Sequence, residues 1–306
     1  IETVGVGQSE TAVHSMVEVI THEQSPDIAG AVKGKQDTGA GDQGIVYGYA
    51  CGETPEFLPL PVVFAHRLTR MLSHVRVLGI VPELRPDGKS QVSVEYEHGL
   101  PKHIVAVVLS CQHEEDADLD ALRRDLMQYV ILPALRELPP DEHTAILINP
   151  SGRFVEGGFE ADTGLTGRKL MVDTYGGLAP HGGGALSGKD GTKVDRSGAY
   201  MARYIAKNIV AAGLADKCQL QLAYAIGVAQ PVSVLAETFG TGKISDAALS
   251  DLVRACFDLR PAAIIERLGL RRPIYVQTSA YGHFGREELN LPWETVDMTE
   301  ALLAKA

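Results

Sequence analysis

The sequence has no apolar run approaching the roughly 20 residues that a membrane-spanning helix needs. Its first three residues lack the basic region and the continuous apolar core of a signal peptide. Only four cysteines occur, and they are scattered without metal-ligand spacing, at Cys51, Cys111, Cys218 and Cys256. A long chain without a secretory signal rarely pairs such cysteines. We therefore expect them to be reduced and mostly structural, and the protein to be cytoplasmic.

Basic residues are also scarce. The 306 residues include 28 Lys and Arg against 39 Asp and Glu, which gives a net charge of -11. This balance argues against a nucleic-acid or anionic-membrane partner, but it permits a phosphate-bearing small molecule wherever cations converge locally. Cations do gather in one glycine-rich stretch, at Arg153, Arg168, Lys169, Lys189, Lys193 and Arg196.

The hydrophobic pattern mixes strands and helices along the whole chain. Apolar alternation and short apolar runs predict strands at 93–97, 104–109, 144–149, 220–226 and 232–235. Helical spacing predicts helices at 118–138, 197–210, 246–257 and 262–268. This order predicts an α+β protein of several similar sheet-plus-helix layers. Residues 30–44, rich in Gly, Lys, Asp and Gln, are the expected mobile loop.

Two glycine motifs resemble nucleotide-binding loops but lack the necessary context. GAGDQG at 39–44 has the GxGxxG spelling, yet no buried strand precedes it, so we reject a dinucleotide-binding fold. GGALSGK at 183–189 has the glycines and lysine of a P-loop, but Asp190 follows where Ser or Thr is required. Closely spaced glycines and a lysine can still hold phosphate without that fold. The alternative is a tight turn without a ligand.

Taken together, the motifs resemble methionine adenosyltransferase (S-adenosylmethionine synthetase). The two signature-like strings are GAGDQG at 39–44 and HGGGALSGKD at 181–190, where Leu186 stands in place of the usual Phe. Further matching strings are LRPDGKSQV at 84–92, NPSGRF at 149–154, GLTGRK at 164–169, VDRS at 194–197, YAIGVA at 224–229 and YGHFGR at 281–286. The resemblance covers nearly the whole chain in the expected order.

The resemblance implies formation of S-adenosylmethionine from L-methionine and ATP, with release of pyrophosphate and phosphate. Because the methionine sulfur is already nucleophilic, the residues must mainly orient the substrates and stabilise an anionic leaving group. The implied catalytic cations are Lys89, Arg168, Lys169 and Lys189. The implied ATP-binding residues are these four together with Asp42, Asp87, Gly88, Arg153, Phe154, Asp162 and Ala185. The implied methionine-binding residues are Gln24, Asp162 and Lys193.

The resemblance also implies two metal ions. Asp195 would ligate Mg²⁺, which favours carboxylate, phosphate and water oxygens, and K⁺ would act as a monovalent activator. A plain alternative for Asp195 is a helix cap, since it lies just ahead of a predicted helix. His181 is assigned no catalytic role, and His283 is interpreted as structural.

The implied architecture is three similar α+β domains built from interleaved segments, with active sites shared in a homodimer or homotetramer. The expected division is 1–29 with 157–196 as an incomplete central domain, 52–156 as an N-terminal-type domain, and 30–51 with 197–306 as the C-terminal domain. A mobile loop is expected near 24–44. The family's opening segment, with a His-Pro-Asp-Lys motif and later glutamates, has no counterpart in the sequence.

Three other hypotheses stay open at this stage. A non-catalytic or truncated regulatory homologue would account for the departure at the start of the sequence. A P-loop kinase and a phosphate-binding structural protein account for fewer of the motifs.

Overall fold

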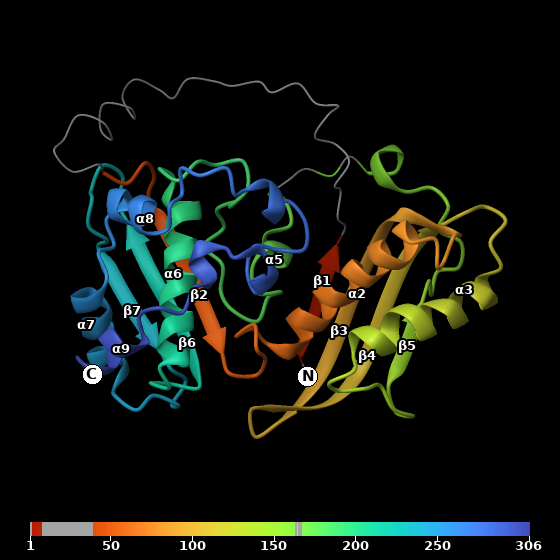
Figure 1. Ribbon diagram of the computed structural model, residues 1–306, viewed down its shortest axis with the longest axis horizontal. Helices are drawn as coiled ribbons and strands as arrows, with labels where there is room; N and C mark the ends of the chain where they lie inside the picture. The colour runs from red at the N-terminus through yellow and green to blue at the C-terminus, as the bar shows by residue number, and fades with distance from the viewer. Residues whose placement is uncertain (1, 8–38, 163, 165–166) are drawn as a thin grey trace. The chain divides into compact units, whose positions relative to one another are not determined.

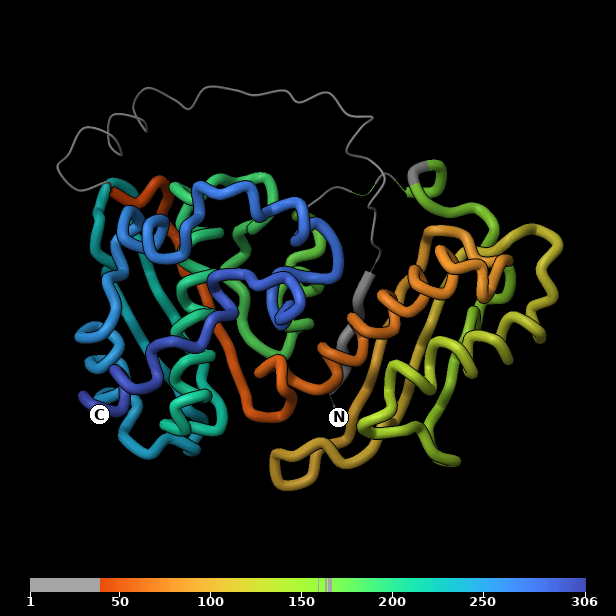
Figure 2. Tube along the Cα trace, viewed as in Figure 1, coloured from red at the N-terminus to blue at the C-terminus, as the bar shows by residue number. Residues whose placement is uncertain are grey.

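The computed structural model describes residues 2–7, 39–162, 164 and 167–306. These residues form two compact units. Unit 1 contains β1 (Glu2–Gly7), Pro59–Leu178 and Thr278–His283. Unit 2 contains residues 39–58, Ala179–Gln277 and Phe284–Ala306. Each unit is therefore assembled from segments far apart in the sequence. In unit 2, the orange segment of residues 39–58 lies beside green and blue segments (Figure 2).

Unit 1 is built on a sheet of the order β1-β3-β4-β5. The long strands β3 (Leu84–Glu97) and β4 (Leu100–His113) form an antiparallel hairpin, and β5 (Ala145–Ile148) joins β4 in parallel. The hairpin turns at His98 and Gly99, which both have positive φ, as a two-residue turn requires. Both strands extend well beyond the ranges predicted from the sequence.

Helices lie along this sheet (Figure 1). Helix α2 (Leu60–Val77) buries Val63, Phe64 and Leu68 against it. Helix α3 (Leu119–Leu126) begins at the cap Asp118, whose carboxylate accepts from two backbone N–H groups. A π-helical turn at Met127–Ile131 leads into α4 (Leu132–Ala134), which contains Pro133. The helix ends one residue after this proline, as predicted.

Unit 2 has a sheet of the order β2-β6-β7, formed by β2 (Gly44–Cys51), β6 (Lys217–Tyr224) and β7 (Ser233–Glu237), all antiparallel. Helix α6 (Val194–Ala211) packs on β2 and β6. The packing is close at Gly48, because a Cβ there would lie 2.0 Å from the Ala202 carbonyl carbon. Helices α7 (Asp246–Cys256), α8 (Pro261–Arg267) and α9 (Thr299–Leu303) complete the unit. The short α5 (Leu170–Asp173) belongs to unit 1.

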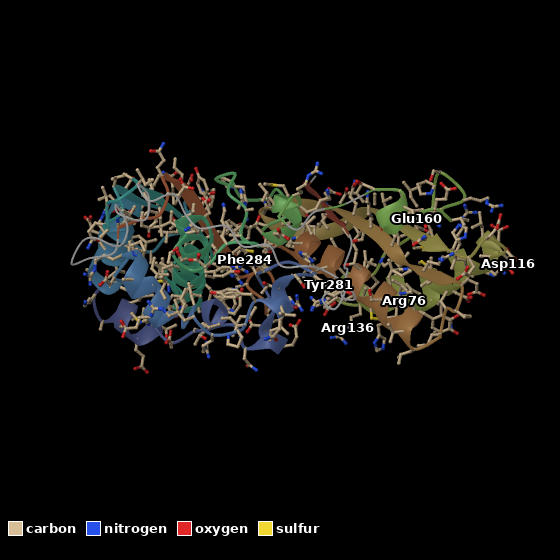
Figure 3. The ribbon with its side chains drawn as sticks, turned by 90° about the horizontal axis from the view of Figure 1, so that it is seen from above. Arg76, Asp116, Arg136, Glu160, Tyr281 and Phe284 are labelled. Carbon is tan, nitrogen blue, oxygen red and sulfur yellow. The ribbon has the colours of Figure 1, made fainter. Side chains whose placement is uncertain are left out.

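Within the described residues the chain passes between the units at four points, after Leu58, Leu178, Gln277 and His283. The first and the last of these passages have close neighbours within unit 2. Tyr281, on the unit 1 side, bonds Ser73, whereas Phe284 packs edge-on against Tyr200 of α6 (Figure 3). A Cβ on Gly285 would lie 2.4 Å from Leu58, so residues 58 and 285, next to the first and the last passage, are adjacent in unit 2.

These features confirm the α+β fold class expected from the sequence. The four cysteines are unpaired, and burial raises the pKa of Cys51, Cys111 and Cys218 to about 12, so these three thiols are inert. No helix in the described part of the chain is long and apolar enough to cross a bilayer. The three-part division stays a prediction, since residues 8–38 lie outside the described ranges. Of the loop predicted at 30–44, residues 39–44 belong to unit 2, where Ala40 exchanges backbone hydrogen bonds with Gly227 and Val228.

Candidate functional site

The first turn of α6 carries the most enclosed charged pair among the predicted site residues. Asp195 accepts a hydrogen bond from Lys189 Nζ at 2.5 Å, and the two side chains are 14% and 30% exposed. The helix N-cap is Lys193, which makes no side-chain cap bond. Asp195 is therefore inside the first turn rather than at the cap, where its charge also complements the helix dipole.

Glycine at position 184 is required by this pair. A Cβ on Gly184 would lie 2.2 Å from Asp195 Cγ and 2.3 Å from Oδ1, so any side chain would displace the carboxylate. Gly44, at the start of β2, faces the same oxygen, with its virtual Cβ 3.7 Å away. We call Gly184, Lys189 and Asp195 the Asp195 cradle. Ala185, a predicted ATP-binding residue, follows Gly184 directly and is half-buried.

Arg196 fixes the backbone that carries Lys189. Its Nη1 donates to the Lys189 carbonyl at 2.7 Å and its Nε donates to Tyr200 Oη at 3.0 Å. The guanidinium also stacks over the Tyr275 ring, 4.0 Å from its centroid, and the side chain is buried. Sequence reasoning placed Arg196 among the converging cations. The structure shows that Arg196 holds the Lys189 main chain in place through its bond to the Lys189 carbonyl.

The glycine run before Lys189 folds around a neutral histidine. Gly183, at φ 92°, donates its N–H to His181 Nδ1 at 2.8 Å. Burial lowers the pKa of His181, although the nearby Asp195 charge opposes this. The ring therefore acts as an acceptor within the turn.

A second group of predicted residues lies in unit 1. Asp87 Oδ2 accepts from the Gly158 N–H at 2.9 Å, and its Oδ1 is buried without a hydrogen-bond partner among the described residues. Asp87 and Gly88 also line a small cavity of about 10 Å³, enough for one water molecule. Gly157 is packed so tightly that a Cβ would lie 2.8 Å from Gln112. The segment from Phe154 to Gly158 is thus held against the ends of β3 and β4.

Phe154 is half-buried in this segment and follows a turn that the NPSGRF string forms. Asn149, with a positive φ of 42°, bonds the Cys111 backbone through both atoms of its amide. Arg153 is exposed and pairs with Glu115 at 3.3 Å. His113 and Gln112, which were not selected from the sequence, contact Phe154 and Val155. They lie beyond the strand predicted at 104–109, so no sequence signal pointed to them.

The remaining predicted residues are on the surface of their units. Lys89 is exposed on β3, and Arg168 and Lys169 are exposed just before α5. Asp162 is exposed, and its backbone closes a turn with Gly158. In unit 2, Asp42 is exposed and caps the Gln43 N–H. Lys193 is half-buried and bonds Thr192 at 3.3 Å.

The predicted residues thus fall into two groups, and their roles stay predictions. Unit 2 holds Asp42, Ala185, Lys189, Lys193 and Asp195, and unit 1 holds Asp87, Gly88, Lys89, Arg153, Phe154, Asp162, Arg168 and Lys169. Gln24 lies outside the described residues. Both rejected motifs have the wrong surroundings: GAGDQG leads into the strand β2 instead of a helix, and α6 begins five residues after Lys189.

Comparison with known protein families shows to which family the chain belongs. A family model for the central domain of S-adenosylmethionine synthetase matches residues 37–154, and one for the C-terminal domain matches residues 156–295. The chain belongs to the S-adenosylmethionine synthetase family. This is a family of transferases, and the resemblance expected from the motifs is confirmed. The match labels 37–154 as central, whereas the motif-based division named 52–156 N-terminal-type.

Proposed function

We propose that the protein is a methionine adenosyltransferase, which transfers the adenosyl group of ATP to the sulfur of L-methionine and releases pyrophosphate and phosphate. The observation that carries this proposal is the Asp195 cradle. A lysine and an aspartate meet beside glycines that leave the backbone open, at the positive end of an 18-residue helix. Such an arrangement suits a polyphosphate.

The roles of this chain's residues follow from their chemistry. Lys189, released from Asp195 by an arriving anion, would bind a phosphate oxygen as a charge-assisted donor. Lys89, Arg168 and Lys169, in unit 1, are exposed cations that the family motifs would assign to phosphate binding. Phe154 offers a ring face to the adenine, and the unpartnered Oδ1 of Asp87 is an acceptor for a nucleoside hydroxyl or amine. Asp162, Lys193 and Gln24 would hold the amino and carboxylate groups of methionine.

Asp195 fits a magnesium ion bound partly by substrate. Its carboxylate stands alone: within the described ranges no three His, Cys, Asp or Glu residues cluster as metal ligands. Magnesium in nucleotide sites takes one or two carboxylates and completes its shell with phosphates and water, so one aspartate suffices. When bound, the ion would neutralise charge that develops on the triphosphate. Activation by K⁺ is proposed from the family alone.

The outer face of the unit 2 sheet supports a proposed homodimer or homotetramer. Ile45 and Leu235 are 41% and 49% exposed, and the strand register places them on the face opposite α6, with Gln221 and Ala223 between them. Exposed aliphatic side chains on a sheet face are suited to burial against a second copy. Light scattering tests this: a mass of one chain at micromolar concentration would contradict it.

An assay with purified protein, L-methionine and ATP tests the proposed activity. S-adenosylmethionine detected by mass spectrometry, only when magnesium is present and faster with potassium, supports it. A protein that binds ATP but forms no product under these conditions would be the non-catalytic homologue.

A further inference from the structure

His113 makes two contacts with one residue, Phe154. Its backbone N–H donates to the Phe154 carbonyl at 3.0 Å, and its ring Nε2 accepts from the Phe154 N–H at 3.0 Å. Both backbone polar groups of Phe154 are therefore satisfied by a single residue. His113 is the last residue of β4 and is 1% exposed.

The second ring nitrogen fixes the tautomer. Nδ1 lies 2.8 Å from the Glu114 carbonyl oxygen, which can only accept. The proton is therefore on Nδ1, and Nε2 is left as the acceptor that the Phe154 N–H requires. The imidazole is neutral, and its orientation is set from both sides.

Two neighbours extend this attachment along the chain. Gln112 donates to the Val155 carbonyl at 2.9 Å and accepts from the Asp87 N–H at 3.3 Å, and Asp87 accepts from the Gly158 N–H. His113 is the member that contacts Phe154 itself. Its contacts are to main-chain atoms, so they fix where the Cα of Phe154 lies and hence where its ring starts.

We propose that His113 is a positioning residue for nucleotide recognition: it holds the Phe154 backbone so that the ring presents a fixed face to the adenine base. This inference rests on the proposed function, in which Phe154 contacts adenine. Loss of the ring acceptor leaves the part-buried Phe154 N–H without this partner. Such a loss typically lowers the equilibrium constant for the ordered backbone position about tenfold. The loss should affect ATP more than methionine.

Two isosteric substitutions separate positioning from simple packing. Gln in His113→Gln places its amide oxygen near the position of Nε2, so it still accepts from Phe154. In His113→Asn the shorter side chain reaches only the position of Nδ1. It can donate to the Glu114 carbonyl, but it provides no acceptor for the Phe154 N–H. His103→Asn is the control for the same substitution. His103 lies near the other end of β4, and its ring pairs with Asp141.

The first readout needs no activity. Hydrogen exchange of the Phe154 amide in the full protein should be about tenfold or more faster in His113→Asn than in wild type, and little changed in His113→Gln and His103→Asn. Nitrogen NMR of the wild type should show Nδ1 protonated and Nε2 unprotonated. Equal exchange in the Gln and Asn variants would overturn the inference.

The second readout is kinetic. KM for ATP should rise about tenfold in His113→Asn and stay within about threefold in His113→Gln, while KM for methionine stays near wild type in both. Preference for ATP over GTP should fall in the Asn variant only. An unchanged KM for ATP in His113→Asn, despite faster amide exchange, would refute the positioning role. Absence of S-adenosylmethionine formation by the wild type would instead refute the proposed function, and the exchange data would still report on the His113 contact.

Discussion

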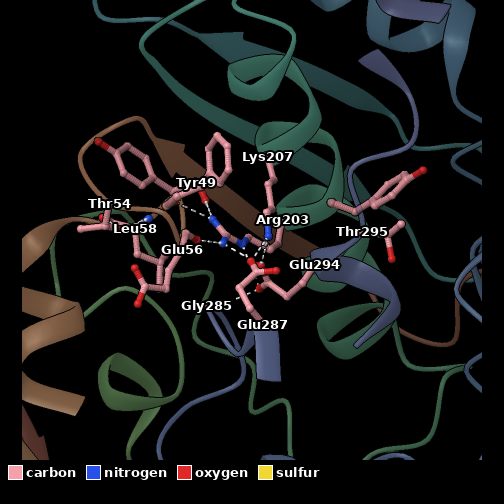
Figure 4. A network of polar contacts seen from close by, with 12 residues as sticks. Tyr49, Thr54, Glu56, Leu58, Arg203, Lys207, Gly285, Glu287, Glu294 and Thr295 are labelled. Carbon is pink, nitrogen blue, oxygen red and sulfur yellow. Dashed lines mark hydrogen bonds and ion pairs between the residues drawn. The ribbon is translucent and has the colours of Figure 1, made fainter. Parts of the chain in front are cut away.

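Arg203 and Glu294 form a buried ion pair in which every guanidinium N–H and both carboxylate oxygens have partners (Figure 4). Arg203 also donates to the carbonyls of Tyr49, Glu56 and Phe57. Glu294 further accepts from Gly285 N–H and Lys207. The pair thus ties α6, which carries Asp195, to residues 49–57 and 285–294 of the same unit. Breaking such a pair from one side leaves an uncompensated buried charge.

Glu294 should make the protein sensitive to acid. Burial alone would raise the pKa of Glu294, but Arg203 and Lys207 together lower it below its ordinary value of 4.5. A carboxyl with a lower pKa in the folded state stabilises the fold above its unfolded pKa, and this stability is lost as pH falls below about 4.5. The melting temperature of the wild type should therefore fall steeply as the pH drops below about 4.5.

Glu294→Gln should remove most of this dependence and cost about 3 kcal/mol at neutral pH, because the buried Arg203 loses its counter-charge and Lys207 keeps only Glu287. Thermal melts from pH 3 to 7 measure both effects. Glu266→Gln, at an exposed position on α8, is the control and should behave like wild type. Parallel curves for wild type and Glu294→Gln would show that Glu294 does not carry the acid sensitivity.

Asp195 should matter for activity and little for stability. Asp195→Asn keeps the volume and removes one charge, and no helix cap is lost because Lys193 is the N-cap. We expect kcat to fall at least about a hundredfold, with the melting temperature near wild type and the magnesium dependence weakened. Asp246→Asn, in the first turn of α7 in the same unit, is the matched control. An active Asp195→Asn enzyme with unchanged magnesium dependence would contradict the metal assignment.

Lys189 should act in the transition state. Lys189→Met keeps the aliphatic stem, so packing beside Gly184 should survive. A charge-assisted bond that strengthens as the triphosphate leaves should cost about 2–4 kcal/mol in kcat, roughly a hundredfold to a thousandfold, with KM for methionine little changed. Steady-state kinetics with each substrate varied measure this. Preserved kcat with lower stability would mean that residues 181–190 form a structural turn.

The sequence predicted the elements whose patterns are strong. The helix expected at 197–210 is α6, and β5, β6, β7, α7 and α8 lie where expected within a few residues, whereas both strands of the hairpin are longer than expected. Helix α2 and strand β2 are among the elements that were missed. Helix α2 follows several prolines and is buried over most of its surface, so its apolar residues show no single face. β2 begins inside glycine-rich residues that favoured a loop.

The candidate site was less predictable than the fold. The motifs identified Lys189 and Asp195, but nothing in their spacing shows that Gly184 leaves room for the Asp195 carboxylate. Arg196 was visible only as a charge, while its stacking on Tyr275 depends on a segment nearly 80 residues later. His113 and Phe154 likewise meet through long-range packing, which one-dimensional periodicity does not encode.

The most direct test of the central claim is the dependence of product formation on methionine, measured with the full-length protein, ATP, magnesium and potassium. The account predicts S-adenosylmethionine, pyrophosphate and phosphate in equal amounts by mass spectrometry and phosphate analysis, with essentially none when methionine is omitted. Hydrolysis of ATP at the same rate with and without methionine, and no S-adenosylmethionine, would contradict it.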